Sequence, residues 1–136
     1  LYVDPNAAIR DSSPLINVWG PEAVHSLAVV TKAWKYVFWP YAEGDFVPTE
    51  ELYPTKEDPL ELKNVAADPA HAQTIEQMRS LYDQAVSHWK HQAVPYHRYQ
   101  QFGVIFDRNI SWSQKQELLK RKTASETKPK EVAKRK

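Results

Sequence analysis

The chain has 136 residues, which is enough for one domain or a piece of one. Its 42% hydrophobic and 26% charged residues can supply a buried core, and its longest apolar stretch, residues 33–41, is too short to span a bilayer. No Cys is present, which excludes disulfides, zinc–thiolate sites and cysteine nucleophiles. The first residue is Leu and no segment like a signal peptide follows it, so we expect the chain to be processed or cut from a longer protein.

The formal net charge of +1 hides an uneven distribution of charge. Residues 1–114 contain 9 Lys and Arg against 14 Asp and Glu, whereas residues 115–136 contain 9 against 3. Residues 122–136 have almost no apolar side chains, so we predict a disordered basic tail there. Because this tail contains Glu126 and Glu131 and no aromatic residue, we favour a solubilising role over nucleic-acid binding.

The first half of the chain predicts strands. Residues 1–21 are interpreted as an irregular leading segment rich in turn sequences, within which residues 15–19 have the composition of a short strand. Residues 25–31 and 34–39 are rich in β-branched and aromatic side chains. The short connection between these two runs predicts an antiparallel hairpin.

Alternation along the second run assigns its side chains to two faces. Trp34, Tyr36 and Phe38 fall on one face of the predicted sheet. A third strand is predicted at residues 51–53. Pro54 follows it and confines it to an edge or an end of the sheet, because proline cannot donate a ladder hydrogen bond.

One amphipathic helix is predicted next. Asp68 is a suitable N-cap, Pro69 fits the first helical position, and Pro95 ends the helix. Apolar residues recur at spacings of three and four, namely Ala72, Ile75, Met78, Tyr82, Ala85, Val86 and Trp89. Such a stripe needs a partner, and the hairpin face is the obvious one. We therefore predict an α+β fold, with a small antiparallel sheet (the hairpin plus a short third or fourth strand) packed by one long amphipathic helix.

These elements divide the chain after residue 21 into three segments. Residues 22–95 hold the sheet and the long helix. Residues 96–121 are interpreted as an aromatic loop and a short helix, which Ser111 and Gln114 open as a capping box. Residues 122–136 are the predicted disordered tail.

The residues offer few candidates for chemistry. His88 and His91 lie one turn apart, but no carboxylate joins them at the spacing of a zinc protease, so we interpret them as structural or solvent-exposed. Acidic pairs lie in turns, and no Ser stands in a nucleophile-elbow sequence. We therefore predict no catalytic and no metal-binding residue. His25 follows the Gly20-Pro21 turn and either lines a pocket or ends a strand; both interpretations stay open.

Two segments resemble the carboxyl-terminal subdomain of type I sulfatases, which belong to the alkaline-phosphatase-like superfamily. The first is the strand pair over residues 27–37, with its Trp34-Lys35-Tyr36 sequence. The second, residues 51–69, is the more specific, because several of its residues fall at the spacings of the family: Leu52-Tyr53, Asp58-Pro59, Glu61, Asn64 and Asp68-Pro69. We expect these residues to mark the fold, with Glu61 and Asn64 bonding loop backbone. The sequence departs from the family at Val30, where Arg is usual, and at Pro54-Thr55.

The resemblance implies that the catalytic residues belong to a larger domain. In this family the nucleophile is a formylglycine made from a C/S-x-P-x-R motif, and a calcium ion orients the sulfate. Ser12-Ser13-Pro14 is followed by Ile16 where that motif requires Arg. We therefore expect calcium and formylglycine in the missing catalytic domain and no cofactor on this chain.

The resemblance also implies a role for this piece. In whole sulfatases the subdomain packs against the catalytic domain and lends loops to the substrate pocket. Here the corresponding segment is residues 17–26, where Trp19 offers a stacking face and His25 a polar contact. We expect both to bind substrate, with the catalytic domain and a sulfate ester as partners, no membrane, and no activity in the isolated chain. The alternative is a stand-alone binding module derived from such a subdomain, for which the basic tail is the best support.

Overall fold

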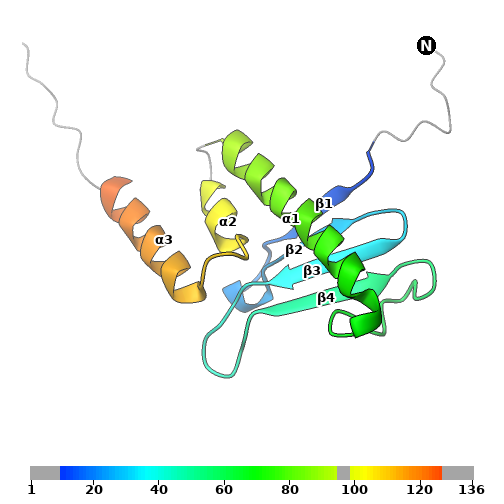
Figure 1. Ribbon diagram of the computed structural model, residues 1–136. Helices are drawn as coiled ribbons and strands as arrows, with labels where there is room; N and C mark the ends of the chain where they lie inside the picture. The colour runs from blue at the N-terminus through cyan, green and yellow to red at the C-terminus, as the bar shows by residue number, and fades with distance from the viewer. Residues whose placement is uncertain (1–9, 95–98, 127–136) are drawn as a thin grey trace, which may run out of the picture.

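The computed structural model describes residues 10–94 and 99–126, and it has the predicted α+β architecture (Figure 1). Four antiparallel strands form one sheet in the order β1-β2-β3-β4. Their bounds are Ser13–Asn17 (β1), Ser26–Val30 (β2), Trp34–Trp39 (β3) and Thr49–Pro54 (β4). Every neighbour in the sheet is the next strand in the chain, so the sheet is a simple meander. The predicted hairpin is β2 and β3, and Pro54 ends the edge strand β4 as expected.

The helices follow the sheet in the chain. A single 3-10 turn (η2, Pro69–His71) leads into α1 (Ala72–Gln92), and α2 (Gln100–Ile105) and α3 (Trp112–Glu126) come after it. A further 3-10 turn, η1 (Glu22–Val24), lies between β1 and β2. Asp68 caps η2 as predicted, because its Oδ1 accepts a 2.9 Å hydrogen bond from the Ala70 N–H.

The core lies between one face of the sheet and the helices. Tyr36 of β3 and Tyr82 of α1 are both 0% exposed, and their rings meet edge to face at 5.4 Å. The Tyr82 hydroxyl donates a 2.7 Å hydrogen bond to the Phe106 carbonyl, which joins α1 to the segment after α2. The buried α1 residues are Ile75, Met78, Tyr82 and Val86. The predicted stripe is therefore confirmed, except that Ala72 is exposed.

The short strand predicted within the leading segment is present as β1, which starts two residues earlier than expected and pairs with β2. Two other predictions are wrong. The aromatic loop predicted ahead of the short helix, within residues 96–121, contains helix α2, which packs so closely on α1 that a Cβ on Gly103 would lie 2.8 Å from Lys90 Cγ. Helix α3 continues to Glu126, beyond the start of the predicted disordered tail. The rest of that tail, residues 127–136, lies outside the described residues.

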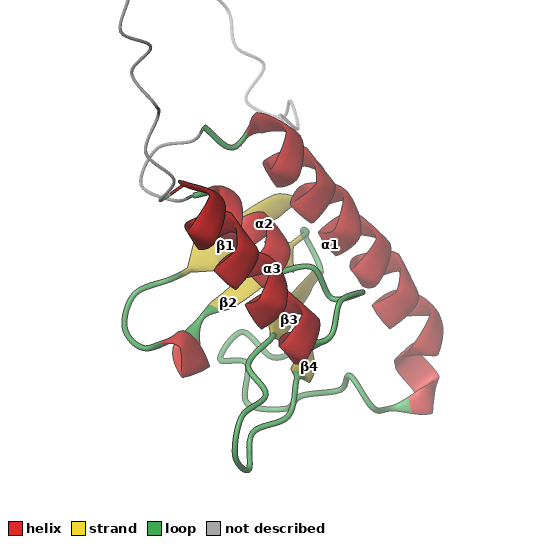
Figure 2. Ribbon diagram, turned by 90° about the vertical axis from the view of Figure 1, so that its left-hand side faces the viewer, coloured by secondary structure: helices red, strands yellow, loops and turns green. Residues whose placement is uncertain are grey.

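The helices cover one face of the sheet. Figure 2 shows α2 and α3 in front of the strands and α1 running beside them. The core side chains of the sheet share one face by alternation: Leu27, Val29, Tyr36, Phe38 and Leu52. Among the described residues, no helix covers the opposite face. A search of the described residues also found no helix long and apolar enough to cross a membrane.

Candidate functional site

The connection between β1 and β2 holds both residues that the sequence singles out. Trp19 is 85% exposed, and its backbone N–H donates to Asn17 Oδ1 at 3.4 Å, whereas its indole makes no hydrogen bond within the described part of the chain. Gly20 follows with a φ of +88°, a conformation that favours glycine and turns the chain toward η1. The Trp19 indole is therefore free to meet another molecule.

His25 is held differently from Trp19. Its Nε2–H donates to the Gly20 carbonyl at 3.1 Å, and its ring meets Phe102 of α2 edge-on at 6.2 Å. Its Nδ1 is buried and has no hydrogen-bond partner among the described residues. His25 thus closes the turn and packs on α2, while Trp19 projects away. Substrate binding by Trp19 and His25 stays a prediction.

The uncovered face of the sheet is a second candidate surface. A hollow of about 270 Å³ lies on it, lined by residues of all four strands together with Glu61. The pairing of the strands decides which side chains lie side by side on this face. Leu15, Ala28 and Val37 form an apolar row, and Asn17, Ser26 and Trp39 lie beside it. The face is therefore apolar along its middle and polar at its ends.

Two polar features of this face stand out. The Trp39 indole nitrogen is buried without a hydrogen-bond partner among the described residues. Lys35 pairs with Glu61 at 2.6 Å, and Glu61 adopts a φ of +55°, which is rare for a residue other than glycine. Glu61 therefore bonds a strand side chain, and the predicted bond to loop backbone is wrong for this residue.

Asn64 behaves as predicted. Its Oδ1 accepts from the Leu52 N–H at 3.0 Å and the Ala66 N–H at 2.9 Å, while its Nδ2 donates to the Glu50 carbonyl at 3.2 Å. The side chain thus fastens the loop to the outer edge of β4. These are structural roles, in line with the interpretation that the segment marks the fold.

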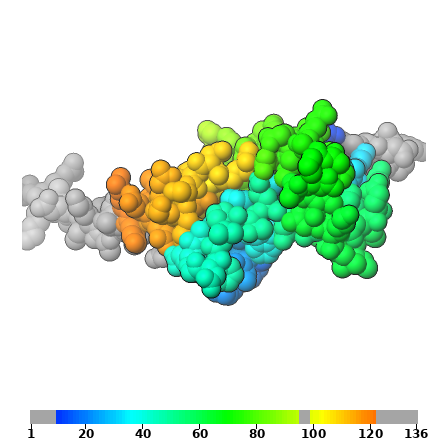
Figure 3. Space-filling model, turned by 60° about the horizontal axis from the view of Figure 1, so that its bottom comes forward, coloured from blue at the N-terminus to red at the C-terminus, as the bar shows by residue number. Residues whose placement is uncertain are grey.

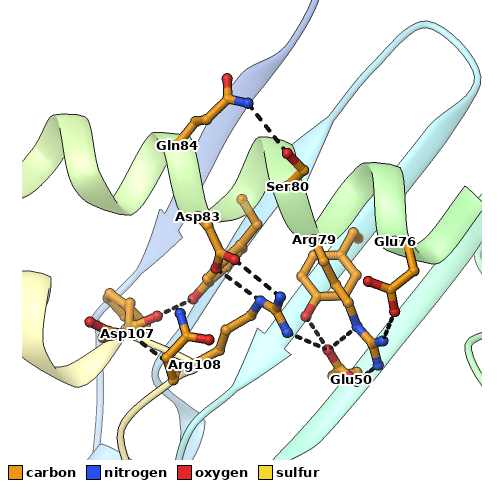
Figure 4. A network of polar contacts seen from close by, with 12 residues as sticks. Glu50, Glu76, Arg79, Ser80, Asp83, Gln84, Asp107 and Arg108 are labelled. Atoms are coloured by element: carbon orange, nitrogen blue, oxygen red, sulfur yellow. Dashed lines mark hydrogen bonds and ion pairs between the residues drawn. The ribbon is translucent and has the colours of Figure 1, made fainter.

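A charged network joins the sheet to α1 and to the start of the α2–α3 connection (Figure 4). Glu50 of β4 is at its centre: the Arg79 Nε donates to it at 2.9 Å, Arg79 Nη2 makes a second bond, and the Tyr36 hydroxyl makes a third. Arg108 pairs with Asp83 through 2.8 Å and 3.0 Å hydrogen bonds. Every charge in the network has an opposite partner, which is the pattern of a structural cluster.

The pKa of Glu50 reflects these contacts. Burial raises it, but the hydrogen bonds from Arg79 and Tyr36 and the charge of Arg108 outweigh burial and hold it below its usual range. The same carboxylate, together with burial, raises the pKa of Tyr36. Glu50 is therefore an ionised anchor, and a general-acid role would need the opposite shift.

His88 and His91 lie on the exposed surface of α1. His91 Nδ1 lies 2.7 Å from the Ser87 carbonyl. Within residues 10–94 and 99–126, no group of three or more His, Asp or Glu side chains is placed to hold a metal ion.

Sequence analysis missed one residue, Lys115 of α3. It is 1% exposed and lies over the Phe38 ring, with its Nζ 5.2 Å from the centroid. The signal was available, because Trp112, Lys115 and Leu119 recur at spacings of three and four and so share the inner face of α3. A Lys within an apolar stripe is a candidate for a buried charge.

Comparison with solved structures gives a likeness of fold. No family model and no curated protein matches the chain. A solved structure of BT4656 in complex with its substrate, D-glucosamine-2-N,6-O-disulfate, is similar at a TM-score of 0.50 and 15% identity, over 65% of this chain and 18% of BT4656. At that identity the match shows the fold alone. The matched region is a small part of that longer protein.

Proposed function

We propose that this chain is the carboxyl-terminal part of a sulfatase, a sulfuric ester hydrolase, and that it packs on the catalytic domain through the uncovered face of its sheet. The observation that carries the proposal is the one-sided layering: helices cover one face, while Leu15, at 53% exposed, and the half-buried Trp39 lie on the other. A sheet whose apolar face lacks a covering layer is completed by another domain. The fold likeness to part of BT4656, whose substrate is a sugar disulfate, supports the same assignment.

The chemistry of hydrolysis would lie in the other domain. This chain has no Cys, and its Ser12-Ser13-Pro14 sequence lacks the Arg of the formylglycine motif. We therefore assign the formylglycine and the calcium ion to the catalytic domain and expect the isolated chain to be inert. In the whole enzyme the exposed Trp19 would stack on the sulfate ester, and His25 would hold the loop that presents it.

The first test is the size of the native protein in its source, by immunoblot with an antibody raised against residues 34–93. A band several times larger than this chain, with sulfate-ester hydrolysis in the same fraction, is the expected result. A band of the size of this chain with no co-purifying catalytic chain contradicts the proposal and favours a stand-alone binding module.

The second test addresses the interface. Leu15→Glu in the whole protein introduces a charge on the uncovered face, and Leu60→Glu, in a loop at 76% exposed, is the matched control. We expect Leu15→Glu to lower thermal stability and sulfate-ester hydrolysis in the whole protein while leaving the unfolding of the isolated chain unchanged. Equal behaviour of the two variants would mean that this face is not an interface.

A further inference from the structure

The Lys115 ammonium is buried, and no carboxylate within the described residues forms an ion pair with it, although the charge of Asp107 attracts it from beyond ion-pair distance. The residue is 1% exposed, and within the described residues its Nζ has no hydrogen bond or ion pair, only the contact with the Phe38 ring. A buried charge that lacks a hydrogen-bonded partner costs several kcal/mol. A protein therefore retains such a charge where a bound group supplies the opposite charge. Burial also lowers the pKa of the amine, to about 8.

Lys115 lines a cleft of about 330 Å³. Pro40 and Pro48, which flank the β3–β4 connection, form one wall, and the segment from Arg108 to Trp112 forms the other. Figure 3 shows the cyan β3–β4 segment lying against the yellow and orange atoms of α2 and α3. The volume is larger than one water molecule requires and suits a small polar group.

The carboxylates near this cleft are already paired. Glu50 also lines it, but Arg79 and Tyr36 hold its oxygens. Asp107 accepts from Lys90 and from the Asn109 N–H. Neither carboxylate makes a hydrogen bond to Lys115, so the positive charge there is not neutralised from within the described part of the chain.

The start of α3 adds a second attraction for an anion. The Ser111 hydroxyl accepts from the Gln114 N–H, whereas no hydrogen bond of the Trp112 and Ser113 N–H groups is found among the described residues. Helix α3 has 15 residues, and Ser111 and Trp112 at its N-terminus line the same cleft as Lys115. The free N–H groups and the helix dipole both favour negative charge there.

We propose that this cleft binds a single tetrahedral oxyanion group, a sulfate or phosphate monoester, with the Lys115 Nζ as its counter-ion and the first turn of α3 as donor. A sulfate or phosphate oxygen accepts several hydrogen bonds, as this combination of donors requires. The inference holds whether or not the uncovered sheet face packs on a catalytic domain, since Lys115 lies on the helical side of the sheet.

The test measures thermal unfolding of the 136-residue chain in sodium sulfate, and separately in sodium phosphate, against sodium chloride of equal ionic strength. The variants are Lys115→Met, which removes the charge and shortens the unbranched side chain by one heavy atom, and Lys120→Met, at an exposed position of the same helix. We expect a saturable rise in Tm for the parent and Lys120→Met that is absent from Lys115→Met. The larger rise of the two anions identifies which ester the cleft prefers.

The dependence of Tm on anion concentration distinguishes binding at the cleft from general salt effects. Sulfate also stabilises proteins by exclusion from their surface, which gives a rise that grows steadily with concentration. A steady rise of equal size in all three proteins would overturn the proposal. A second readout does not depend on a variant: sulfate should slow acetylation of Lys115 by acetic anhydride, followed by peptide mass spectrometry, without slowing that of Lys120. Equal rates with and without sulfate at Lys115 would also overturn it.

Discussion

Trp112 and Glu43 are 69 positions apart in the chain, and the Trp112 indole N–H donates a 3.0 Å hydrogen bond to the Glu43 carboxylate. The Gln116 amide donates to the same oxygen, and the Tyr41 ring meets the Trp112 ring edge-on at 5.1 Å. The β3–β4 connection is thus fastened to the first two turns of α3. Trp112 of this junction also lines the cleft beside Lys115.

Loss of the indole N–H should loosen this junction. Trp112→Phe keeps an aromatic ring but leaves Glu43 without this donor, and we expect it to lower the free energy of unfolding by roughly 1–2 kcal/mol. Urea unfolding of the chain measures the change. Glu57→Ala, at an exposed position remote from α3, is the control and should leave the midpoint unchanged. An unaltered midpoint for Trp112→Phe would show that α3 is not held by this bond.

Acid should unfold the protein partly through Glu50. Its pKa is below the usual range in the folded state, so its contribution to stability is present above the unfolded pKa of about 4.3 and is lost as the pH falls through the folded pKa. Glu50→Gln should lower the free energy of unfolding at pH 7 by about 2 kcal/mol and flatten its dependence between pH 5 and pH 3. Part of the slope should remain, because hydrogen bonds from Lys90 and Asn109 also outweigh burial and lower the pKa of Asp107. Urea unfolding across this range is the measurement, and parallel curves for parent and variant would contradict the assignment.

Alkali should first stabilise the protein and then destabilise it. Burial lowers the pKa of Lys115 to about 8, Asp107 opposes this and Lys90 adds to it. Between pH 8 and about 10, Lys115 holds more protons in the unfolded chain than in the folded chain. The free energy of unfolding therefore rises with pH, by about 3 kcal/mol at most. Above about pH 10 the raised pKa values of Tyr36 and Tyr82 reverse the slope, since the folded state then holds more protons.

The rise between pH 8 and pH 10 is the part that identifies Lys115. Lys115→Met should remove it, and Lys120→Met should retain it, in urea unfolding at half-unit steps of pH without added sulfate or phosphate. A rise that survives in Lys115→Met would assign it to another group.

Substitutions of Trp19 and His25 should distinguish effects on substrate binding from effects on the stability of the fold. Trp19→Ala should leave the free energy of unfolding unchanged, because the side chain is 85% exposed. His25→Ala should lower the free energy of unfolding, because it removes the hydrogen bond to Gly20 and the contact with Phe102. Under the proposed sulfatase assignment, both substitutions should raise KM for the sulfate ester in the whole protein. Unchanged kinetics in both variants would remove these residues from the substrate site.

Local patterns were sufficient for the regular elements. The alternation of Trp34, Tyr36 and Phe38 and the helical stripe around Tyr82 each predict which face is buried, and both faces meet in the core. Asp68 and Asn64 were assigned correctly because their bonds reach only a few residues or a neighbouring strand. Helix α2 escaped prediction because it has six residues, too few for a periodic pattern, and it is stabilised by packing of Gly103 on α1.

The sequence by itself determined the α+β class, the hairpin and the long amphipathic helix, because these depend on spacing along the chain. Only the tertiary structure decided that one face of the sheet is uncovered, that Trp19 is exposed while His25 is packed, and that Lys115 lies in a cleft without a counter-ion. Each of these depends on groups brought together from distant parts of the chain, as Glu43 and Trp112 are. A linear pattern shows which side chains are apolar or charged, whereas burial and pairing are set by what the fold places beside them.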